Sequence, residues 1–277
     1  MAIATLDDLI GAYKQEMSWA KTASRPSAGS NWYATRDLPG TATASLIAGL
    51  NTTVGIKPSS DTDANSAVIG CLPLNAFDTG ARGYLTRVEI GAYSSAGAGR
   101  YQLVDVLWAA GPFQTASTVW NLGAAPSFTD RLPEISPGVP DFTGVEMWVE
   151  AVLACPSGSA LTIEYAGHAG WSSTTSVSIG GFAAGRMAQV ALGPGQIGIR
   201  NVASVQVNNS MTSGAANILL VRPLWQGRAP APNMGVVHDA LKTGMPEVFP
   251  GSALTWFQCA ETTACGTFDA SIQIASK

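Results

Sequence analysis

The positions of apolar and polar side chains divide the sequence into a short helical pattern followed by a long series of strand patterns. In the first 20 residues, apolar side chains recur at intervals of three and four, which is the spacing of one helix face. These side chains are Leu6, Leu9, Ile10, Tyr13 and Met17. Thr5 precedes them and Asp8 follows Thr5 by three positions, which is the capping-box arrangement of a helix N-terminus. The pattern predicts an amphipathic helix in the first 20 residues.

A passage rich in Ser, Gly and Pro, at 21–40, follows this helix and is typical of a linker. We therefore predict an N-terminal arm of helix and linker, residues 1–40, ahead of a main domain at 41–277. The arm either docks on another protein or folds back on its own domain, and the pattern favours neither. If it docks, the five apolar side chains of the helix are the expected contact residues. Whether 21–83 forms a small separate unit stays open.

From about residue 84 the pattern changes to short runs of alternating apolar positions, broken by Gly, Pro, Ser and Asn. In the first run, Leu85 is out of phase with Val88 and Ile90, so we predict a β-bulge or a twist near Arg87. Further strands are expected at 101–108, 145–153, 160–166, 174–179, 187–192, 196–208, 217–225, 253–259 and 267–274. Many short strands without βαβ alternation predict a mainly β fold, a β-sandwich of jelly-roll type with an N-terminal helix and long loops.

A long insertion at 226–251, QGRAPAPNMGVVHDALKTGMPEVFPG, interrupts the strand series. Its Ala-Pro repeats predict a stiff, extended start. Residues 234–241 could form a short helix that ends at Gly244 and Pro246. Two roles fit such an insertion equally well: it covers a neighbouring molecule, or it packs on its own sheet.

The composition is rich in apolar residues and poor in charge. Apolar residues make up 46% of the chain and charged residues only 12%, about half of the roughly 25% typical of soluble domains. The polar surface is therefore built mainly from neutral groups, which lose their water at low cost when a partner binds. This favours a surface covered by contacts, as in a homo-oligomer. A monomer from an Ala/Gly-rich proteome is the alternative.

The charge pattern argues against binding to nucleic acid or to an anionic membrane. The formal net charge is −4, and the 15 basic residues form no cluster that could neutralise a run of phosphates. The first residues carry two acids before any base, unlike a signal peptide, and no run reaches the roughly 18 apolar residues of a membrane helix. The cysteines, in no metal-binding spacing, are expected as buried thiols, although Cys259 and Cys265 could pair under oxidising conditions.

Two motifs that would indicate ligand binding are weak. The segment GPGQIG at 193–198 matches GxGxxG, but β-branched residues rather than a helix follow it, so we interpret it as a hairpin turn. The segment DTDAN at 61–65 is similar to the start of a calcium loop. Ser66 and Leu72 stand where an EF-hand needs glycine and glutamate, which leaves a simpler calcium site or a solvated loop.

The remaining candidates for chemistry are histidines, carboxylates and tryptophans. His168 and His238 are too isolated to predict a zinc site or a nucleophile–base pair. Four strand carboxylates could converge as a glycosidase pair: Glu89, Glu146, Glu150 and Glu164. Six tryptophans could form a sugar-binding platform, although tryptophans more often fill cores: Trp108, Trp120, Trp148, Trp171, Trp225 and Trp256. We expect no enzymatic activity, no catalytic residue, no metal and no cofactor.

Residues 161–224 carry a recognisable order of elements: a strand that ends in Tyr (LTIEY), a Gly-rich turn, an AGRM segment, a GIR strand and a VRPL strand. In this quarter of the chain the sequence resembles uncharacterised tailed-bacteriophage virion proteins encoded among head genes. The resemblance implies a head-associated role, such as a decoration or cement protein or a minor capsid protein. It transfers no catalytic residues.

The hypothesis that follows is a structural virion protein, made in the host cytoplasm, that stabilises the capsid through protein–protein contacts. Its expected partners are the major capsid protein or other virion proteins and further copies of itself. The alternative is a collar or fibre protein that binds a receptor or glycan. An enzyme that cleaves cell-wall polysaccharide ranks last, because the sequence has no recognisable acid–base pair.

Overall fold

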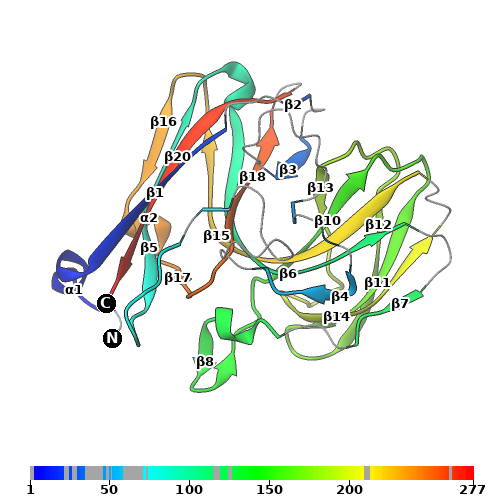
Figure 1. Ribbon diagram of the computed structural model, residues 1–277, viewed down its shortest axis with the longest axis horizontal. Coiled ribbons are helices and arrows are strands. Elements are labelled where there is room, and N and C mark those ends of the chain that lie inside the picture. Colours follow the sequence, from blue (N-terminus) through cyan, green and yellow to red (C-terminus); the bar gives the residue numbers. More distant parts are fainter. Residues whose placement is uncertain are drawn as a thin grey trace. The chain divides into compact units, whose positions relative to one another are not determined.

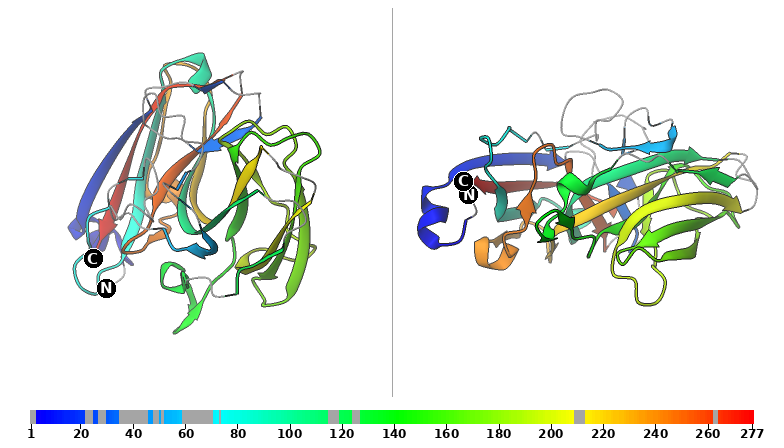
Figure 2. Two further views of the ribbon diagram at one scale, coloured as in Figure 1. Left: turned by 45° about the vertical axis from the view of Figure 1, so that its right-hand side comes forward. Right: turned by 90° about the horizontal axis from the view of Figure 1, so that it is seen from below.

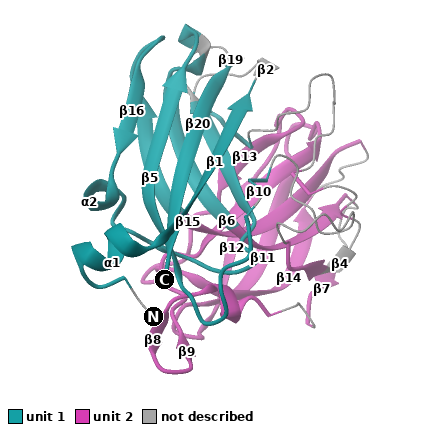
Figure 3. Cartoon of the chain, turned by 60° about the vertical axis from the view of Figure 1, so that its left-hand side comes forward, with its two compact units in different colours: residues 1–40, 70–105, 224–277 teal, residues 41–69, 106–223 magenta. Residues whose placement is uncertain are grey.

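A computed structural model describes residues 3–21, 25–26, 30–34, 46–47, 50, 52–58, 71–72, 74–114, 119–123, 127–208, 213–261 and 264–277 (Figure 1). The protein is mainly β, with antiparallel sheets and short helices, as the sequence predicts. The chain forms two compact units (Figure 3). Unit 1 comprises residues 1–40, 70–105 and 224–277, and unit 2 comprises 41–69 and 106–223. This division differs from the predicted arm at 1–40 and domain at 41–277.

Two long strands contain boundaries between the units: β6 (Gly99–Phe113) and β15 (Ala215–Ala229). The other elements of unit 1 are α1 (Leu6–Gly11), β1 (Tyr13–Lys21), β2 (Arg25–Pro26), β3 (Trp32–Ala34), β5 (Gly83–Ala92), the 3-10 turn Ser95–Gly97, β16 (Gly235–His238), α2 (Ala240–Thr243), β17 (Glu247–Val248), β18 (Leu254–Ala260), β19 (Ala264–Cys265) and β20 (Phe268–Ser276). Its largest sheet has the order β1-β20-β5-β16, and β17 also pairs with β5.

The predicted bulge in β5 is confirmed. Arg87 pairs with Gln273 of β20, and the next pair joins Leu85 to Ile274, so Thr86 is the additional residue. Because one extra residue reverses the alternation of faces, the out-of-phase side chains of this strand all reach the core. Those side chains are Leu85, Val88 and Ile90.

The predicted helix over the first 20 residues is wrong beyond Gly11. The capping box is present, since the amide of Asp8 donates to Thr5 Oγ1 at 3.1 Å and the amide of Thr5 donates to Asp8 Oδ2 at 3.0 Å. Strand β1 then pairs with β20 along its whole length. Alternate side chains from Gln15 onward face inward, and Met17 is only 5% exposed. A spacing of four residues, as between Tyr13 and Met17, occurs on one face of a helix and also on one face of a strand. The segment is a strand because it pairs with β20.

A second group of strands completes unit 1, because β18 pairs with β3 and with residues 99–105 of β6. Aromatic rings fill the core of this unit. The ring centroids of Tyr101 and Phe268 are 4.6 Å apart, and those of Trp225 and Trp256 are 5.8 Å apart. The buried carboxylate of Asp105 accepts hydrogen bonds from Ser252 Oγ at 2.7 Å and from the amide of Ala253 at 2.9 Å.

Unit 2 is the predicted β-sandwich; Figure 2 gives two further views of its strands. Its remaining elements are β4 (Thr52–Ile56), β7 (Val119–Asn121), the 3-10 turn Thr129–Arg131, β8 (Glu134–Ser136), β9 (Val139–Pro140), β10 (Glu146–Leu153), β11 (Ala160–Gly167), β12 (Ser172–Ser178), β13 (Arg186–Gln189) and β14 (Ile199–Asn208). One sheet has the order β12-β11-β14-β7, and in the other β4, β6, β15, β10 and β13 pair in succession.

The core of unit 2 lies between these two sheets. As predicted, Leu161, Ile163 and Tyr165 of β11 face one way and are buried. They belong to the same apolar cluster as Met147 and Val149 of β10. Burial of apolar side chains from both sheets is the main stabilising contribution in such a sandwich.

The insertion at 226–251 packs on its own sheet in unit 1, which is one of the two roles considered for it. Strand β15 continues to Ala229, and β16 pairs with β5. The helix predicted at 234–241 is shorter and begins later, as α2. Asp239 caps its N-terminus, because the carboxylate of Asp239 accepts a hydrogen bond of 3.1 Å from the amide of Lys242. It ends as predicted at Gly244, which has the left-handed φ of 70° that glycine adopts readily.

Candidate functional site

Helix α1 exposes large apolar side chains. Leu6 is 70% exposed, Ile10 is 65% exposed, and Tyr13, at the start of β1, is 61% exposed. Leu9 is half-buried, and no residue of the helix is fully buried. The stripe predicted from the sequence therefore exists over one and a half turns, and it faces outward.

The helix α2 brings a further apolar side chain to the same end of the large sheet. Tyr13 pairs with Ser276 of β20, which in turn pairs with Gly83, so α1 joins the sheet where β5 begins. Thr243 Oγ1 donates to the carbonyl of Leu85 at 2.9 Å, which holds α2 at this end as well (Figure 3). Leu241 of α2 is 92% exposed. We call Leu6, Ile10, Tyr13 and Leu241 the apolar end of unit 1.

An ion pair fixes the position of α1. The ammonium group of Lys277 contacts the carboxylate of Asp8, and the amides of Ala4 and Thr5 donate to the same carboxylate. The hydrogen bond from Lys277 is the largest of the interactions that hold the pKa of Asp8 far below its usual value. Lys277 thus contacts a helix that has no buried side chain of its own.

The structure changes the predicted docking set of Leu6, Leu9, Ile10, Tyr13 and Met17 at one residue. Met17 lies in the core of unit 1 instead of on the arm, because β1 is a sheet strand. Leu241 was missed, since a run of apolar residues in the insertion gave no sign of which of them would stay exposed. Partner docking itself remains a prediction.

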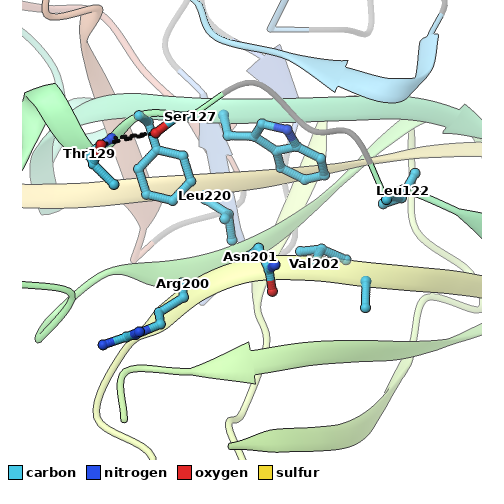
Figure 4. A pocket seen from close by; sticks show the side chains of 11 residues that line it. Leu122, Ser127, Thr129, Arg200, Asn201, Val202 and Leu220 are labelled. Atoms are coloured by element: carbon cyan, nitrogen blue, oxygen red, sulfur yellow. Dashed lines mark hydrogen bonds between the residues drawn. The ribbon is translucent and has the colours of Figure 1, made fainter. Parts of the chain in front are cut away.

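A pocket of about 260 Å³ lies within unit 2. Figure 4 shows Ser127 and Thr129 on one side of it, and Arg200, Asn201 and Val202 of β14 on the other. The hydroxyl groups of Ser127 and Thr129 are 3.0 Å apart. The guanidinium group of Arg200 is already engaged, since its Nε donates to the carbonyl of His168 at 2.8 Å. The lining combines apolar walls with a few polar groups, as small-molecule sites do.

The two histidines each accept a hydrogen bond within one unit. The amide of Ile197 donates to His168 Nδ1 at 3.3 Å, and Trp225 Nε1 donates to His238 Nδ1 at 2.9 Å. Among the described residues, no group of three or more His, Cys, Asp or Glu side chains could hold a metal ion. The segment at 61–65, considered for calcium, lies outside the described residues.

The four strand carboxylates have separate structural partners. Arg87 pairs with Glu89 at 2.8 Å. Trp148 Nε1 donates to Glu146 at 2.8 Å, and Ser204 Oγ donates to Glu164 at 2.7 Å. Glu150 is fully buried and accepts the amide of Leu46 at 2.6 Å and the side-chain amide of Asn217 at 3.1 Å.

Four of the six tryptophans considered for a sugar-binding platform lie in the core. Trp108, Trp148, Trp225 and Trp256 are buried, and Trp171 is the one of the six considered that is largely exposed, at 73%. The segment 193–198 is a turn, as predicted, but no hairpin, because the preceding strand β13 pairs with β10. Cys155, Cys259 and Cys265 are buried thiols, as predicted, while Cys71 is half-buried. Burial raises the pKa of Cys155 and of Cys259.

Comparisons with known proteins identify no family. No protein-family model matches the sequence, and no curated protein is significantly similar to it. Two solved structures align with the chain. The first is infectious bursal disease virus, Gt strain: the sequences are 10% identical, the alignment covers 95% of this chain and 81% of the other, and the TM-score is 0.18. The second is a mutant VP2 protein of infectious bursal disease virus in derived T=1 particles: the sequences are 10% identical, the alignment covers 96% of this chain and 77% of the other, and the TM-score is 0.19. TM-scores this low do not establish a common fold. No helix in the described part of the chain is long and apolar enough to cross a membrane.

Proposed function

We propose that this chain is a structural component of a tailed-phage virion, a capsid decoration or minor capsid protein that stabilises the particle through protein–protein contacts. The observation that carries the proposal is the apolar end of unit 1. Leu6, Ile10 and Tyr13 stay exposed although the unit has a filled core of its own. Exposed apolar side chains that gather at one place on a folded protein are typical of an interaction site.

The physical contribution of this surface is the burial of apolar area on a partner. Removing a large apolar side chain from water stabilises a contact by roughly 1.5–3 kcal/mol. A stable interface also needs about 1,000 Å² of buried surface in total, so neutral polar surface around the apolar end would have to join it. A chain with only 12% charged residues offers such surface with little cost for desolvating ions.

The partner is proposed as the major capsid protein or another shell protein of the virion. The resemblance of residues 161–224 to head-gene products supports a phage head as the location. A decoration protein of this kind would bridge neighbouring shell subunits and add buried area across their joints. It would resist the outward pressure of the packaged genome without any chemical step.

The proposal is tested by replacing three of the four side chains of the apolar end, without changing the core. The variant combines Leu6→Ser, Ile10→Ser and Tyr13→Ser, all at exposed positions. A control carries Ile135→Ser and Val139→Ser, two exposed positions on the β8–β9 hairpin of unit 2. A phage that lacks the gene is complemented with each protein, and the copies per purified particle are counted by quantitative mass spectrometry. We expect occupancy to fall for the variant and not for the control; equal occupancy would overturn the proposal.

A receptor-binding collar or fibre protein is the second candidate, and the pocket of unit 2 is the observation that favours it. Asn201 and the Ser127–Thr129 pair supply hydrogen-bonding groups beside apolar walls, an arrangement that suits a sugar. A glycan array with the purified protein and with Asn201→Ala decides. Binding that Asn201→Ala abolishes would favour this candidate, whereas no binding by the native protein would eliminate it.

A further inference from the structure

Strand β12 is an edge strand without the usual protection against pairing. It lies at one edge of the sheet β12-β11-β14-β7 and reads SSTTSVS, with no charge and no proline. It pairs with β11 over seven residues without a bulge. Natural edge strands are commonly protected by charges, proline, bulges or short length, because an open edge pairs with other strands.

Other edge strands of the described sheets have such protection. Strand β1 carries Lys14, Glu16 and Lys21. Strand β16 has four residues and β7 has three. Strand β4 has five residues and pairs with β6 with a register shift. Among the described strands, β12 pairs only with β11. The side chain of Thr175 donates to the carbonyl of Ala191 at 2.9 Å, so the segment after β13 contacts the half-buried face of β12.

The register of β11 and β12 shows which groups face this open edge. The amide of Gly167 donates to the carbonyl of Trp171, and the amide of Ile179 donates to the carbonyl of Ser159, so odd-numbered residues of β12 bond to β11. The even-numbered residues therefore direct their amides and carbonyls away from the sheet. These residues are Ser172, Thr174, Ser176 and Ser178, whose side chains are also exposed.

The order of residues in β12 fits a second copy of the same strand. Around Thr175 the outward-facing residues are small hydroxyl side chains in both directions. Antiparallel pairing on a two-fold axis at Thr175 therefore places Thr174 opposite Ser176 of the other copy and Ser172 opposite Ser178. All of these are outward-facing residues, and each such pair exchanges two backbone hydrogen bonds. Thr175 meets its own copy in a non-hydrogen-bonded pair, with the two Cα atoms about 4.5 Å apart.

Electrostatics permits this pairing. The nearest charge on β11 is Glu164, which lies opposite Thr174 and accepts a hydrogen bond from Ser204. In the paired sheet, the two copies of Glu164 are separated by at least three strand spacings, about 14 Å. That distance exceeds the screening length of about 8 Å at physiological salt. No like charges therefore oppose one another across the new edge.

We infer that β12 joins two copies of this chain through antiparallel strand pairing centred on Thr175, so that two four-stranded sheets become one continuous sheet. This inference goes beyond the proposed function, because it names a surface for the self-association that the charge-poor composition favours. The exposed indole of Trp171, next to the start of β12, would lie beside the far end of the partner's β12. The interface is small, so the free protein should dimerise reversibly.

Analytical ultracentrifugation over a concentration series tests the inference on the full chain. Thr174→Lys with Ser176→Lys places lysines opposite each other at two symmetric positions, and we expect the dimer dissociation constant to rise about tenfold or more. The matched control is Ser18→Lys with Ala20→Lys, two exposed positions on the edge strand β1. It should dimerise as the native chain does, and all three proteins should have the same circular dichroism spectrum.

A covalent trap tests the register. Thr175→Cys should form a disulfide-linked dimer under mild oxidation, since the expected Cα separation of about 4.5 Å suits a disulfide, whereas Ser18→Cys should stay monomeric on a non-reducing gel. A native chain that is monomeric at every concentration, a lysine variant that dimerises normally, or a Thr175→Cys protein that does not cross-link would overturn the inference. The proposed function fails separately, if the native chain is absent from purified particles.

Discussion

The substitution Met17→Ala tests whether β1 is a structural strand or part of a free arm. Met17 is almost completely buried, pairs with Ile272 of β20 and belongs to the apolar core of unit 1. Truncation to alanine removes most of a buried side chain and leaves a cavity beside neighbours such as Trp19. If the N-terminal segment were a detached helix, the same change would affect only an exposed residue.

The expected size of the effect follows from burial. Buried Met→Ala substitutions destabilise proteins by about 2–5 kcal/mol, and an edge strand, which can relax, belongs at the lower end. For a unit of this size, 1 kcal/mol corresponds to about 3–5 °C in the unfolding midpoint. We therefore expect Met17→Ala to lower the midpoint by roughly 6–15 °C. Leu6→Ala, at an exposed position of α1, should change stability by no more than about 0.5 kcal/mol.

Differential scanning calorimetry of the native chain and of both variants measures these shifts under identical conditions. A Met17→Ala midpoint equal to that of the native protein would refute the packing of β1. A loss in Leu6→Ala as large as that in Met17→Ala would show that α1 is part of the core, and the apolar end could then not serve as a free surface.

Three further predictions concern single groups. The pKa of Asp8 is lower in the folded protein than its usual value, so the ionised carboxylate stabilises the fold above pH about 4, and this stabilisation is lost as the pH falls further. The variant Asp8→Asn should therefore show a smaller decrease of the thermal midpoint in acid than the native chain. Burial raises the pKa of Tyr101, so the neutral phenol stabilises the fold below pH about 10, and this stabilisation is lost as the pH rises further. The free energy of unfolding in urea should therefore fall less at alkaline pH for Tyr101→Phe than for the native chain. Glu150→Ala leaves the donors of Leu46 and Asn217 without this acceptor and should cost about 2–4 kcal/mol in urea unfolding, and Glu150→Gln should cost less, because one acceptor oxygen remains; equal losses would contradict this.

The strands of the sandwich were predictable because their alternation is strong and local. Leu161, Ile163 and Tyr165 alternate without interruption, and their faces are as predicted. The phase change between Leu85 and Val88 located a bulge, since only an extra residue places both side chains on the core face.

What the sequence could not predict depends on contacts between distant segments. Residues 13–21 form a strand because β20, some 250 residues later, supplies its hydrogen-bonding partner. Likewise, β13 pairs with β10 rather than with its neighbour in sequence. The exposure of Leu241 follows from where α2 docks on β5, which no local pattern encodes. For the same reason, the open edge of β12 became visible only once its sheet order was known.

The most direct test of the central claim is the number of copies of this chain per purified, nuclease-treated phage particle, measured by quantitative mass spectrometry. Our account predicts a fixed stoichiometry that matches a symmetric set of positions on the particle, and fewer copies when Leu6, Ile10 and Tyr13 are replaced by serine. The absence of the native chain from particles that are otherwise complete would contradict it.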